Sequence, residues 1–431
     1  MKVEVQDVTT VKKVLNVEIP EEDVTRQLDK VCQELRRTVM IRGFRPGKVP
    51  RSIIEQRFRK EINAEVSAKL ISDSLTKALE EVKLVPLGEP DIERPNIEKG
   101  RAYRYSATIE ILPEIDDIDF NGLRLKKNIY SVKETDIEEE LKRIQKTNAQ
   151  LNTVEENRPV QKGDFVVIDY EGFKDGKPFV HSKKVENFLV EVGSGHMLEE
   201  FENNLLGMLP DTHKDIPVHF PEDYYNKNLA GNDITFKVHL KEIKEQIIPE
   251  LDDEFAKDIG YESLDKLKKA IEENLQKRNE MRSNQELETQ ILEALSEKTD
   301  FELPETMVNE ELRTLVDNRK NAFSRRGLSL EDTGESEEEF AEKYRSLAER
   351  NVRNYLILKK IIDQEKITVS DELLDEEYKK IADSTNQPVE MIKAYHEKHK
   401  ESLETFKWRI LRDQAIKLIL EKSAIENIEK E

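Results

Sequence analysis

The stretch Arg42-Gly43-Phe44-Arg45-Pro46-Gly47-Lys48-Val49-Pro50 decides how the first part of the chain is organised. Two glycines and two prolines within these residues exclude a helix and predict a tight loop. An aromatic ring, Phe44, stands among basic residues. From Arg36 to Lys60 the sequence has nine Lys or Arg residues and one acidic residue, Glu55. This is a local charge of +8 in a chain whose net charge is −21.

Helices are predicted on both sides of the loop. Over 21–39, spacings of three and four residues place five apolar side chains on one helix face: Val24, Leu28, Val31, Leu35 and Val39. After Pro50, Ser52 and Glu55 have the spacing of a capping box, which predicts a second helical region running to about Val82. The sequence therefore predicts a helical hairpin with a basic loop at its tip.

Residue pattern alone leaves two interpretations of the loop. It is either a solvated basic turn whose Phe44 folds back on its own helices, or a docking element. In a docking element, Arg45 and Lys48 contact phosphates or carboxylates while the ring enters an apolar crevice. A nucleotide-binding loop is excluded, because only three residues separate the glycines and Val49 follows the lysine. No other ATP signature is present, so ATP-independent action without a cofactor is expected.

The segment 43–50 is similar to the ribosome-docking signature of the trigger factor family, Gly-Phe-Arg-x-Gly-Lys-x-Pro, at every fixed position. The resemblance implies a chaperone that docks near the exit tunnel of the large ribosomal subunit, against ribosomal protein and rRNA. Its expected partners are nascent and unfolded polypeptides, and a homodimer can form away from the ribosome. The implied docking residues are Gly43, Phe44, Arg45, Pro46, Gly47, Lys48 and Pro50.

The composition of the whole chain fits a polar multidomain protein. Its 431 residues correspond to about three domains, with 36% hydrophobic and 37% charged residues. No apolar run reaches the roughly 18 residues of a membrane span, and the charged N-terminal stretch does not resemble a signal peptide. The lone cysteine, Cys32, excludes an intramolecular disulfide. These features predict a cytoplasmic protein, disfavour a periplasmic chaperone-isomerase, and make general RNA binding through the basic hairpin improbable given the overall negative charge.

Two alternating segments, 14–19 and 103–111, predict strands that accompany the hairpin in a small α+β domain over 1–113. This domain would be the ribosome-binding domain. A linker is expected over 114–149, with an extended connector at 113–122. A charged helix is expected to begin at the apparent capping box of Thr135 and Glu138 and to end near Leu151.

Short strands dominate the region 150–245. Strands are predicted at 165–173, 188–193 and 234–243, with a turn at Asp175-Gly176 and a short helix over 197–206. This pattern predicts a compact half-barrel. The region resembles the FKBP-type prolyl isomerase domain of trigger factor in five landmarks: Ile168-Asp169-Tyr170, Gly193-Ser194-Gly195, the Phe201 helix, Phe220-Pro221-Glu222-Asp223-Tyr224 and Phe236.

The resemblance implies peptidyl-prolyl isomerisation in an aromatic pocket. Carried over by position, the catalytic pocket residues are Tyr170, Phe179, Phe188, Met197, Leu198, Phe201, Tyr224 and Phe236. Aromatic residues at alternating strand positions are also typical of a structural core. Three departures from the family pattern, Val180, Glu199 and Glu200, predict weak-to-moderate catalysis. The alternative function is a free-standing FKBP-type isomerase without ribosome docking.

Residues 246–431 are expected to form an all-helical C-terminal body with arms. Helix breaks are predicted near Pro304, 327–334 and 387–388, and Ser370 is a predicted helix start. His396 and His399 lack a third ligand, so surface histidines and no metal site are expected. By resemblance, this region cradles unfolded chain. The predicted fold class is therefore multidomain α+β: an N-terminal α+β domain, an inserted FKBP-like half-barrel and a helical body.

Overall fold

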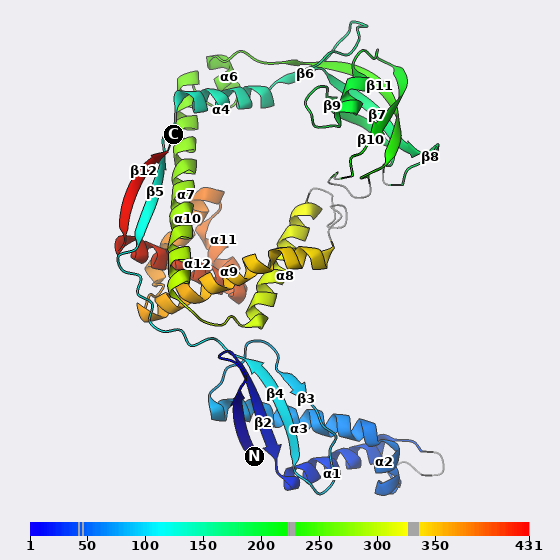
Figure 1. The fold of residues 1–431 in the computed structure, drawn as a ribbon, viewed down its shortest axis with the longest axis vertical. Helices are drawn as coiled ribbons and strands as arrows, with labels where there is room; N and C mark the ends of the chain where they lie inside the picture. Colours follow the sequence, from blue (N-terminus) through cyan, green and yellow to red (C-terminus); the bar gives the residue numbers. More distant parts are fainter. Residues whose placement is uncertain are drawn as a thin grey trace. The chain divides into compact units, whose positions relative to one another are not determined.

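The computed structural model describes residues 1–41, 44, 47–180, 182–222, 224, 229–325 and 336–430 (Figure 1). The chain forms two units. Unit 1 contains 1–121, 292–316 and 341–421, and unit 2 contains 122–291, 317–340 and 422–431. The chain thus leaves unit 1 after Asn121 and returns to it at Leu292.

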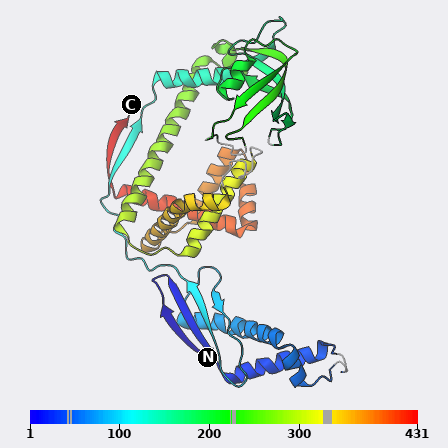
Figure 2. The same ribbon diagram turned by 45° about the vertical axis from the view of Figure 1, so that its right-hand side comes forward.

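Unit 1 begins with an antiparallel sheet of order β1-β2-β4-β3, formed by β1 (Lys2–Asp7), β2 (Lys12–Ile19), β4 (Tyr103–Glu110) and β3 (Asp91–Glu93). The alternation along β2 buries Leu15, Val17 and Ile19. The helices α1 (Glu21–Thr38) and α3 (Arg59–Val82) cover this buried face of the sheet (Figures 1 and 2). Both predicted strands are confirmed, whereas β1 and β3 were not predicted.

The helical hairpin is confirmed, but its second helix begins differently from the prediction. Pro50 occupies the N-cap position of α2 (Arg51–Arg57), with φ −60°. Proline suits this end of a helix because its fixed φ and missing N–H cost nothing there. Ser52 therefore lies inside the first turn and caps nothing, while Glu55 pairs with Arg51 one turn away. The predicted capping box is wrong.

The helices of the C-terminal region are α8 (Glu305–Ser324), α9 (Glu337–Gln364), α10 (Asp371–Thr385), α11 (Val389–Lys398) and α12 (Lys400–Glu421). The predicted breaks at Pro304 and 387–388 are confirmed, and the Ser370 hydroxyl accepts a hydrogen bond from Leu373 N–H at 3.2 Å. The whole of the predicted break at 327–334 lies outside the described residues, which exclude 326–335.

His396 differs from the expected surface histidine. Its ring lies 5.0 Å from the Phe406 ring and 5.6 Å from the Tyr378 ring, measured between centroids. Burial lowers the pKa of His396, because the charged imidazolium loses hydration among these rings. The apolar faces of α10, α11 and α12 meet at this point, and a single helix pattern does not reveal which residues share it.

Unit 2 contains α4 (Glu134–Thr147), α6 (Asp253–Asp258) and the first part of α7 (Leu264–Lys298), which pack through Leu141, Phe255 and Leu267. The predicted start of α4 is wrong, because Lys133 precedes the helix and its N–H donates to the Asp136 carboxylate at 2.9 Å. The predicted end at Leu151 is also wrong. Residues Gln150–Thr153 pair with a strand as β6.

The half-barrel is a six-stranded sheet whose main order is β10-β11-β7-β8. Its strands are β7 (Phe165–Lys174), β8 (Lys177–Pro178), β9 (Val185–Glu191), β10 (Thr212–His219) and β11 (Asp233–Ile247), with β6 paired to β11 and β9 paired to β7. The short helix α5 (Glu199–Leu205) packs on the sheet through Phe201 and Leu205. The turn at Asp175-Gly176 is confirmed by positive φ angles of 51° and 75°.

A parallel pair of strands, β5 (Arg124–Tyr130) and β12 (Ala424–Lys430), was not predicted. The helical character of the C-terminal region is confirmed, with β12 as an addition. No helix in the described part of the chain combines the length and the apolar character that crossing a bilayer requires.

Candidate functional site

The hairpin loop is anchored at both of its described ends. Ile41 is 6% exposed and Val49 is fully buried, so both side chains hold the loop to the N-terminal core. The Gly47 N–H donates to the Arg36 carbonyl at 3.1 Å, and Gly47 has φ +79°, which favours glycine. Of the predicted docking residues, Gly43, Arg45 and Pro46 lie outside the described residues, as does Arg42.

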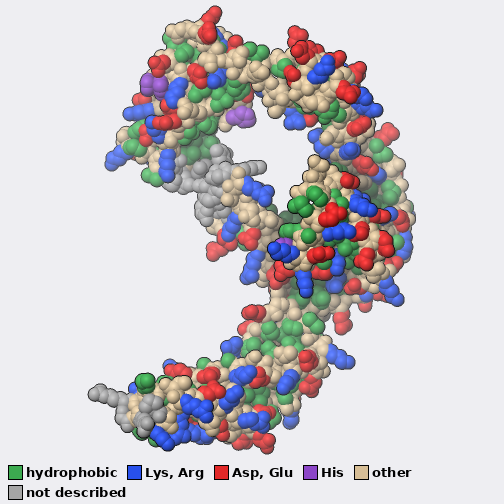
Figure 3. All heavy atoms as spheres, turned by 180° about the vertical axis from the view of Figure 1, so that it is seen from behind, with side chains coloured by type: hydrophobic (Ala, Val, Ile, Leu, Met, Phe, Trp, Pro, Cys, Tyr) green, Lys and Arg blue, Asp and Glu red, His purple; other side chains and the backbone are tan. Residues whose placement is uncertain are grey.

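The described tip of the loop presents apolar and basic side chains to solvent. Phe44 is 38% exposed and the preceding Met40 is 87% exposed. Lys48 and Pro50 are exposed as well. The Phe44 ring thus keeps part of its surface free for contact with another molecule. In Figure 3, Lys and Arg side chains gather at the end of the N-terminal domain to which the loop belongs.

The basic residues of the hairpin have different surroundings. Arg51 forms ion pairs with Asp29 at 2.6 Å and with Glu55. The hydrogen bond from Arg51 lowers the pKa of Glu55, and Glu55 in turn raises the pKa of Arg51. Arg51 thus has a structural role, because its guanidinium joins α1 to α2 through these ion pairs. Arg36 and Arg37 are exposed in the last turn of α1, where positive charge is favourable.

The rings predicted for the pocket meet around Tyr170 of β7. The ring centroid of Tyr170 lies 5.5 Å from Phe188, 5.9 Å from Phe236 and 6.3 Å from Phe201, each in an edge-to-face arrangement. Phe201 and Phe236 are themselves 5.5 Å apart. These four rings, which we call the aromatic cluster, come from β7, β9, α5 and β11, so the fold brings together residues far apart in sequence.

The other predicted pocket residues surround this cluster. Four half-buried side chains pack against the same core: Phe179, Met197, Leu198 and Tyr224. The structure therefore gathers the whole predicted set in one region. It adds Phe220, which is 4% exposed and lies 4.9 Å from the Tyr224 ring and 6.3 Å from the Phe236 ring. The Phe-Pro-Glu-Asp-Tyr landmark contains Phe220 and was the signal for it.

Burial separates the floor of this region from its rim. Phe201 is 2% exposed and Phe236 is 7% exposed, so both are core residues, whereas Phe188 is 37% exposed. Burial raises the pKa of the Tyr170 hydroxyl, because ionisation in an apolar site is unfavourable. A neutral, mostly apolar surface suits an X-Pro amide whose resonance is lost as it twists through a barrier near 18–20 kcal/mol.

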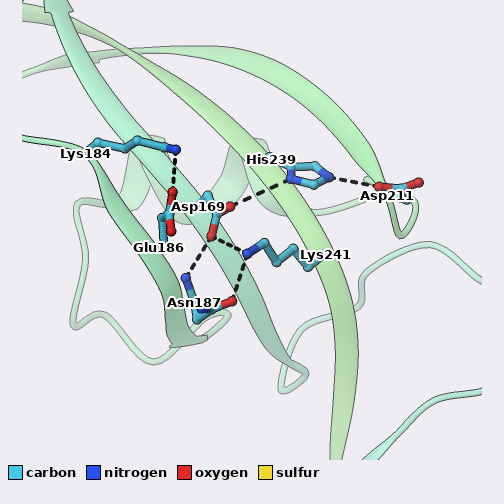
Figure 4. Close-up of polar contacts among 7 residues, drawn as sticks. All are labelled: Asp169, Lys184, Glu186, Asn187, Asp211, His239 and Lys241. Carbon is cyan, nitrogen blue, oxygen red and sulfur yellow. Dashed lines mark hydrogen bonds and ion pairs between the residues drawn. The ribbon is translucent and has the colours of Figure 1, made fainter.

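A polar cluster on the other face of β7 fixes the strand that carries Phe188 (Figure 4). The Asp169 carboxylate accepts hydrogen bonds from Asn187 N–H at 2.7 Å and from Lys241 Nζ at 2.8 Å, and Lys241 also donates to the Asn187 side chain. The Lys241 ammonium, together with the Asn187 N–H, lowers the pKa of Asp169. This carboxylate thereby joins β7, β9 and β11 next to the aromatic cluster.

The departures from the family pattern lie at the margin of the cluster. Val180 is 73% exposed. The Glu200 carboxylate accepts from His219 N–H at 3.0 Å and so caps the end of β10, while Glu199 is exposed. Among the described residues, no group of three or more His, Cys, Asp or Glu side chains is arranged to hold a metal ion.

Comparison with known families covers most of the chain. Residues 1–144 match the model described as "Bacterial trigger factor protein (TF)", and residues 263–421 match that of the trigger factor C-terminus. Residues 156–241 match the model "FKBP-type peptidyl-prolyl cis-trans isomerase".

Individual relatives agree along the full length. The chain is 42% identical over 433 residues to the trigger factor of Desulfatibacillum aliphaticivorans, covering 100% of this chain and 99% of the relative. It is also 42% identical over 429 residues to that of Desulfosudis oleivorans, covering 99% and 97%. A solved trigger factor chaperone structure, described as "Promiscuous Substrate Recognition in Folding and Assembly Activities of the Trigger Factor Chaperone", shares the fold with a TM-score of 0.50 at 20% identity, covering 98% of this chain and 99% of that one. The chain belongs to the trigger factor family of ribosome-associated chaperones and carries the family's FKBP-type isomerase domain.

Proposed function

We propose that this chaperone docks through its 42–50 loop on the large ribosomal subunit near the polypeptide exit tunnel. The observation that carries the proposal is a solvent-exposed Phe44 on a loop anchored by buried Ile41 and Val49. The ring would enter an apolar crevice of a ribosomal protein, while Lys48 and Arg45 contact rRNA phosphates or acidic side chains. In the described part of the loop, Gly47 with its positive φ and Pro50 at the start of α2 fix the backbone.

Docking makes a weak binder effective. A tethered surface meets an emerging apolar segment at high effective concentration, before such segments meet one another. Many weak contacts exchange quickly and release the chain without ATP. We assign docking to residues 1–113, a linker to 114–149, isomerisation to 150–245 and substrate cradling to 246–431. This activity belongs in the cytoplasm, and a homodimer away from the ribosome would cover the same surfaces.

For the isomerase domain, we infer that the predicted pocket residues around the aromatic cluster bind the X-Pro segment. Tyr170 and Phe188 would face the substrate, and Phe201 and Phe236 would form the floor beneath it. No acid or nucleophile is needed, because an apolar aromatic surface stabilises the twisted amide of the transition state more than water does. Exposed Val180 and Glu199 at the margin favour a weak-to-moderate rate.

Ribosome co-sedimentation tests the docking proposal. The native chain is compared with a triple variant, Phe44→Ala, Arg45→Ala and Lys48→Ala. The matched control is Val85→Ala, Lys77→Ala and Lys83→Ala, which removes the same charge and one apolar side chain that is 79% exposed. We expect the loop variant to lose roughly tenfold or more in affinity for large subunits, and the control to pellet like the native chain.

The same experiment distinguishes ribosome docking from the alternative of a free-standing isomerase. If the loop variant pelleted with large subunits as well as the native chain, docking through this loop would be refuted. Binding to isolated small subunits alone would refute the choice of subunit. Sedimentation equilibrium of the ribosome-free protein tests the homodimer, and a concentration-independent monomer mass would contradict it.

A further inference from the structure

Glu202 is a buried charged residue that the proposed mechanism does not use. It lies on α5 directly after Phe201 and is 4% exposed. Its carboxylate forms no ion pair with a described residue. Instead, it accepts three backbone hydrogen bonds: Gly193 N–H at 2.9 Å and Gly195 N–H at 3.2 Å on Oε2, and Met197 N–H at 3.0 Å on Oε1. A buried carboxylate is costly unless such donors surround it.

The loop that donates these bonds is shaped for the purpose. Gly193 and Gly195 have φ angles of +86° and +76°, a conformation that L-residues with a side chain rarely adopt. Their N–H groups converge on one carboxylate oxygen, as in other backbone arrangements that bind anions. Ser194 reinforces the turn, since its hydroxyl donates to the Glu191 carbonyl at 2.9 Å. The loop is thus folded around the Glu202 side chain.

The held loop leads directly into the proposed substrate pocket. Met197, whose N–H is bound by Glu202, and the following Leu198 both pack against the core beside the aromatic cluster. Phe201 on the same helix contributes a ring of that cluster. We propose that Glu202 is a positioning residue for the isomerase site: its buried carboxylate fixes the 193–197 backbone and thereby sets Met197 and Leu198 against the bound X-Pro segment.

The chemistry of the side chain makes the inference specific. A carboxylate offers two accepting oxygens, one for the two glycine N–H groups and one for Met197. The amide of a Glu202→Gln variant accepts at one end only, so its NH₂ group would face a backbone N–H at the other end. Shape and volume are preserved, but one part of the loop must move away. A displaced pocket wall weakens substrate binding even though the fold persists.

The inference rests on the proposed pocket, so the experiment separates the two. Isomerisation of a proline-containing peptide is measured with the native chain, Phe188→Ala, Glu202→Gln and Asp164→Asn. Asp164 is a matched control. It is a 6% exposed carboxylate of the same domain that accepts one backbone N–H, from Gln161. The other partner of Asp164 is Arg158, which does not belong to the aromatic cluster.

We expect kcat/KM of Glu202→Gln to fall by roughly tenfold to a hundredfold, chiefly through KM, while Asp164→Asn keeps its KM. Peptide-resolved hydrogen exchange should show, in Glu202→Gln, an increase over 193–197 that exceeds the increase in the rest of the domain, whereas Asp164→Asn should show no such local excess. A kcat/KM within about twofold of native, or a fall no larger than that of Asp164→Asn, would overturn the role of Glu202.

Two further outcomes are informative. No acceleration by the native chain, or no effect of Phe188→Ala, would refute the proposed pocket but not the hydrogen bonds of the loop. If Glu202→Gln does not fold, exchange in the native chain decides. Protected amides at Gly193, Gly195 and Met197 support the inference, and exchange at the rate of an unstructured loop refutes it.

Discussion

The side-chain amide of Gln290 on α7 binds both backbone groups of Lys126 on β5. Its Nε2 donates to the Lys126 carbonyl at 2.8 Å and its Oε1 accepts from the Lys126 N–H at 2.9 Å. Further along the same helix, Ser283 donates to the Asn128 carbonyl at 2.6 Å and Asn279 to the Tyr130 carbonyl at 3.2 Å. One face of α7 thus replaces a neighbouring strand along an edge that would otherwise be unpaired.

Replacing Gln290 by alanine should weaken this edge. Gln290→Ala removes two neutral hydrogen bonds and should cost about 1–2 kcal/mol locally. We expect faster amide exchange in the peptide that contains Lys126, measured by mass spectrometry on the full chain. Gln285→Ala is the control, because Gln285 is exposed on the same helix. Equal exchange at Lys126 in both variants would contradict the role of Gln290.

The isomerase domain should lose stability in acid through Asp164. Burial raises the pKa of Asp164, but hydrogen bonds from the Arg158 guanidinium, at 2.6 Å and 2.9 Å, and from Gln161 N–H outweigh it, and the net pKa is lowered. Because the folded pKa lies below the unfolded value near 3.8, this contribution is complete above that value. It is lost as the pH falls through the folded pKa.

Asp164→Asn should therefore lower the stability of the domain at pH 7 by about 1.5–3 kcal/mol and make its acid dependence shallower. Urea unfolding followed by exchange in peptides of 156–241, at a series of pH values from 7 to about 3, measures both quantities. A variant whose stability fell as steeply below about pH 4 as that of the native chain would show that other carboxylates dominate.

Phe188 and Phe236 should respond differently to truncation. Phe236→Ala removes a ring that is 7% exposed and should cost about 3–5 kcal/mol of stability. Phe188→Ala removes a ring that is 37% exposed and should cost about 1 kcal/mol or less, while lowering kcat/KM for a proline peptide. Thermal unfolding and the peptide assay are compared on the same samples. Loss of stability without loss of activity in Phe188→Ala would remove this ring from the site.

Lys83 ends α3 in the left-handed region, with φ 54° and ψ 37°. A lysine is strained there, so Lys83→Gly should stabilise the N-terminal domain by about 0.5–1 kcal/mol. The matched control is Lys77→Gly in the exposed interior of the same helix, which should cost about 1 kcal/mol. Opposite shifts in the denaturation midpoint confirm the prediction, and a loss in both variants contradicts it.

Local patterns in the sequence predicted those elements in which the buried side chains recur at one regular spacing along the chain. Leu15, Val17 and Ile19 of β2 gave the alternation of a half-buried strand, and both hairpin helices showed a clear apolar face. The strand β1 was missed because most of its residues are exposed, so its charged residues concealed the alternation. Pro50 shows a second limit. A favourable spacing of Ser52 and Glu55 does not make a cap when proline already starts the helix.

Contacts between distant segments could not be predicted from one sequence. The pocket residues were assigned by resemblance, and the structure supplied the ring distances that bring them together. Glu202 was missed because its partners are backbone N–H groups, which every residue possesses. The only signal was a glutamate between two buried apolar residues, Phe201 and Leu205, after a loop with two glycines.

The parallel pairing of β5 with β12 has a consequence for how the molecule is made. Arg124 pairs with Ala424 in this register, so the ribosome must add 300 residues between the two positions. At roughly 5–20 residues per second, this takes about 15–60 s. Because α7 emerges well before β12, its side chains can hold β5 during the interval. A chaperone that acts on incomplete polypeptides therefore cannot complete its own β5–β12 pair until one of its last segments is translated.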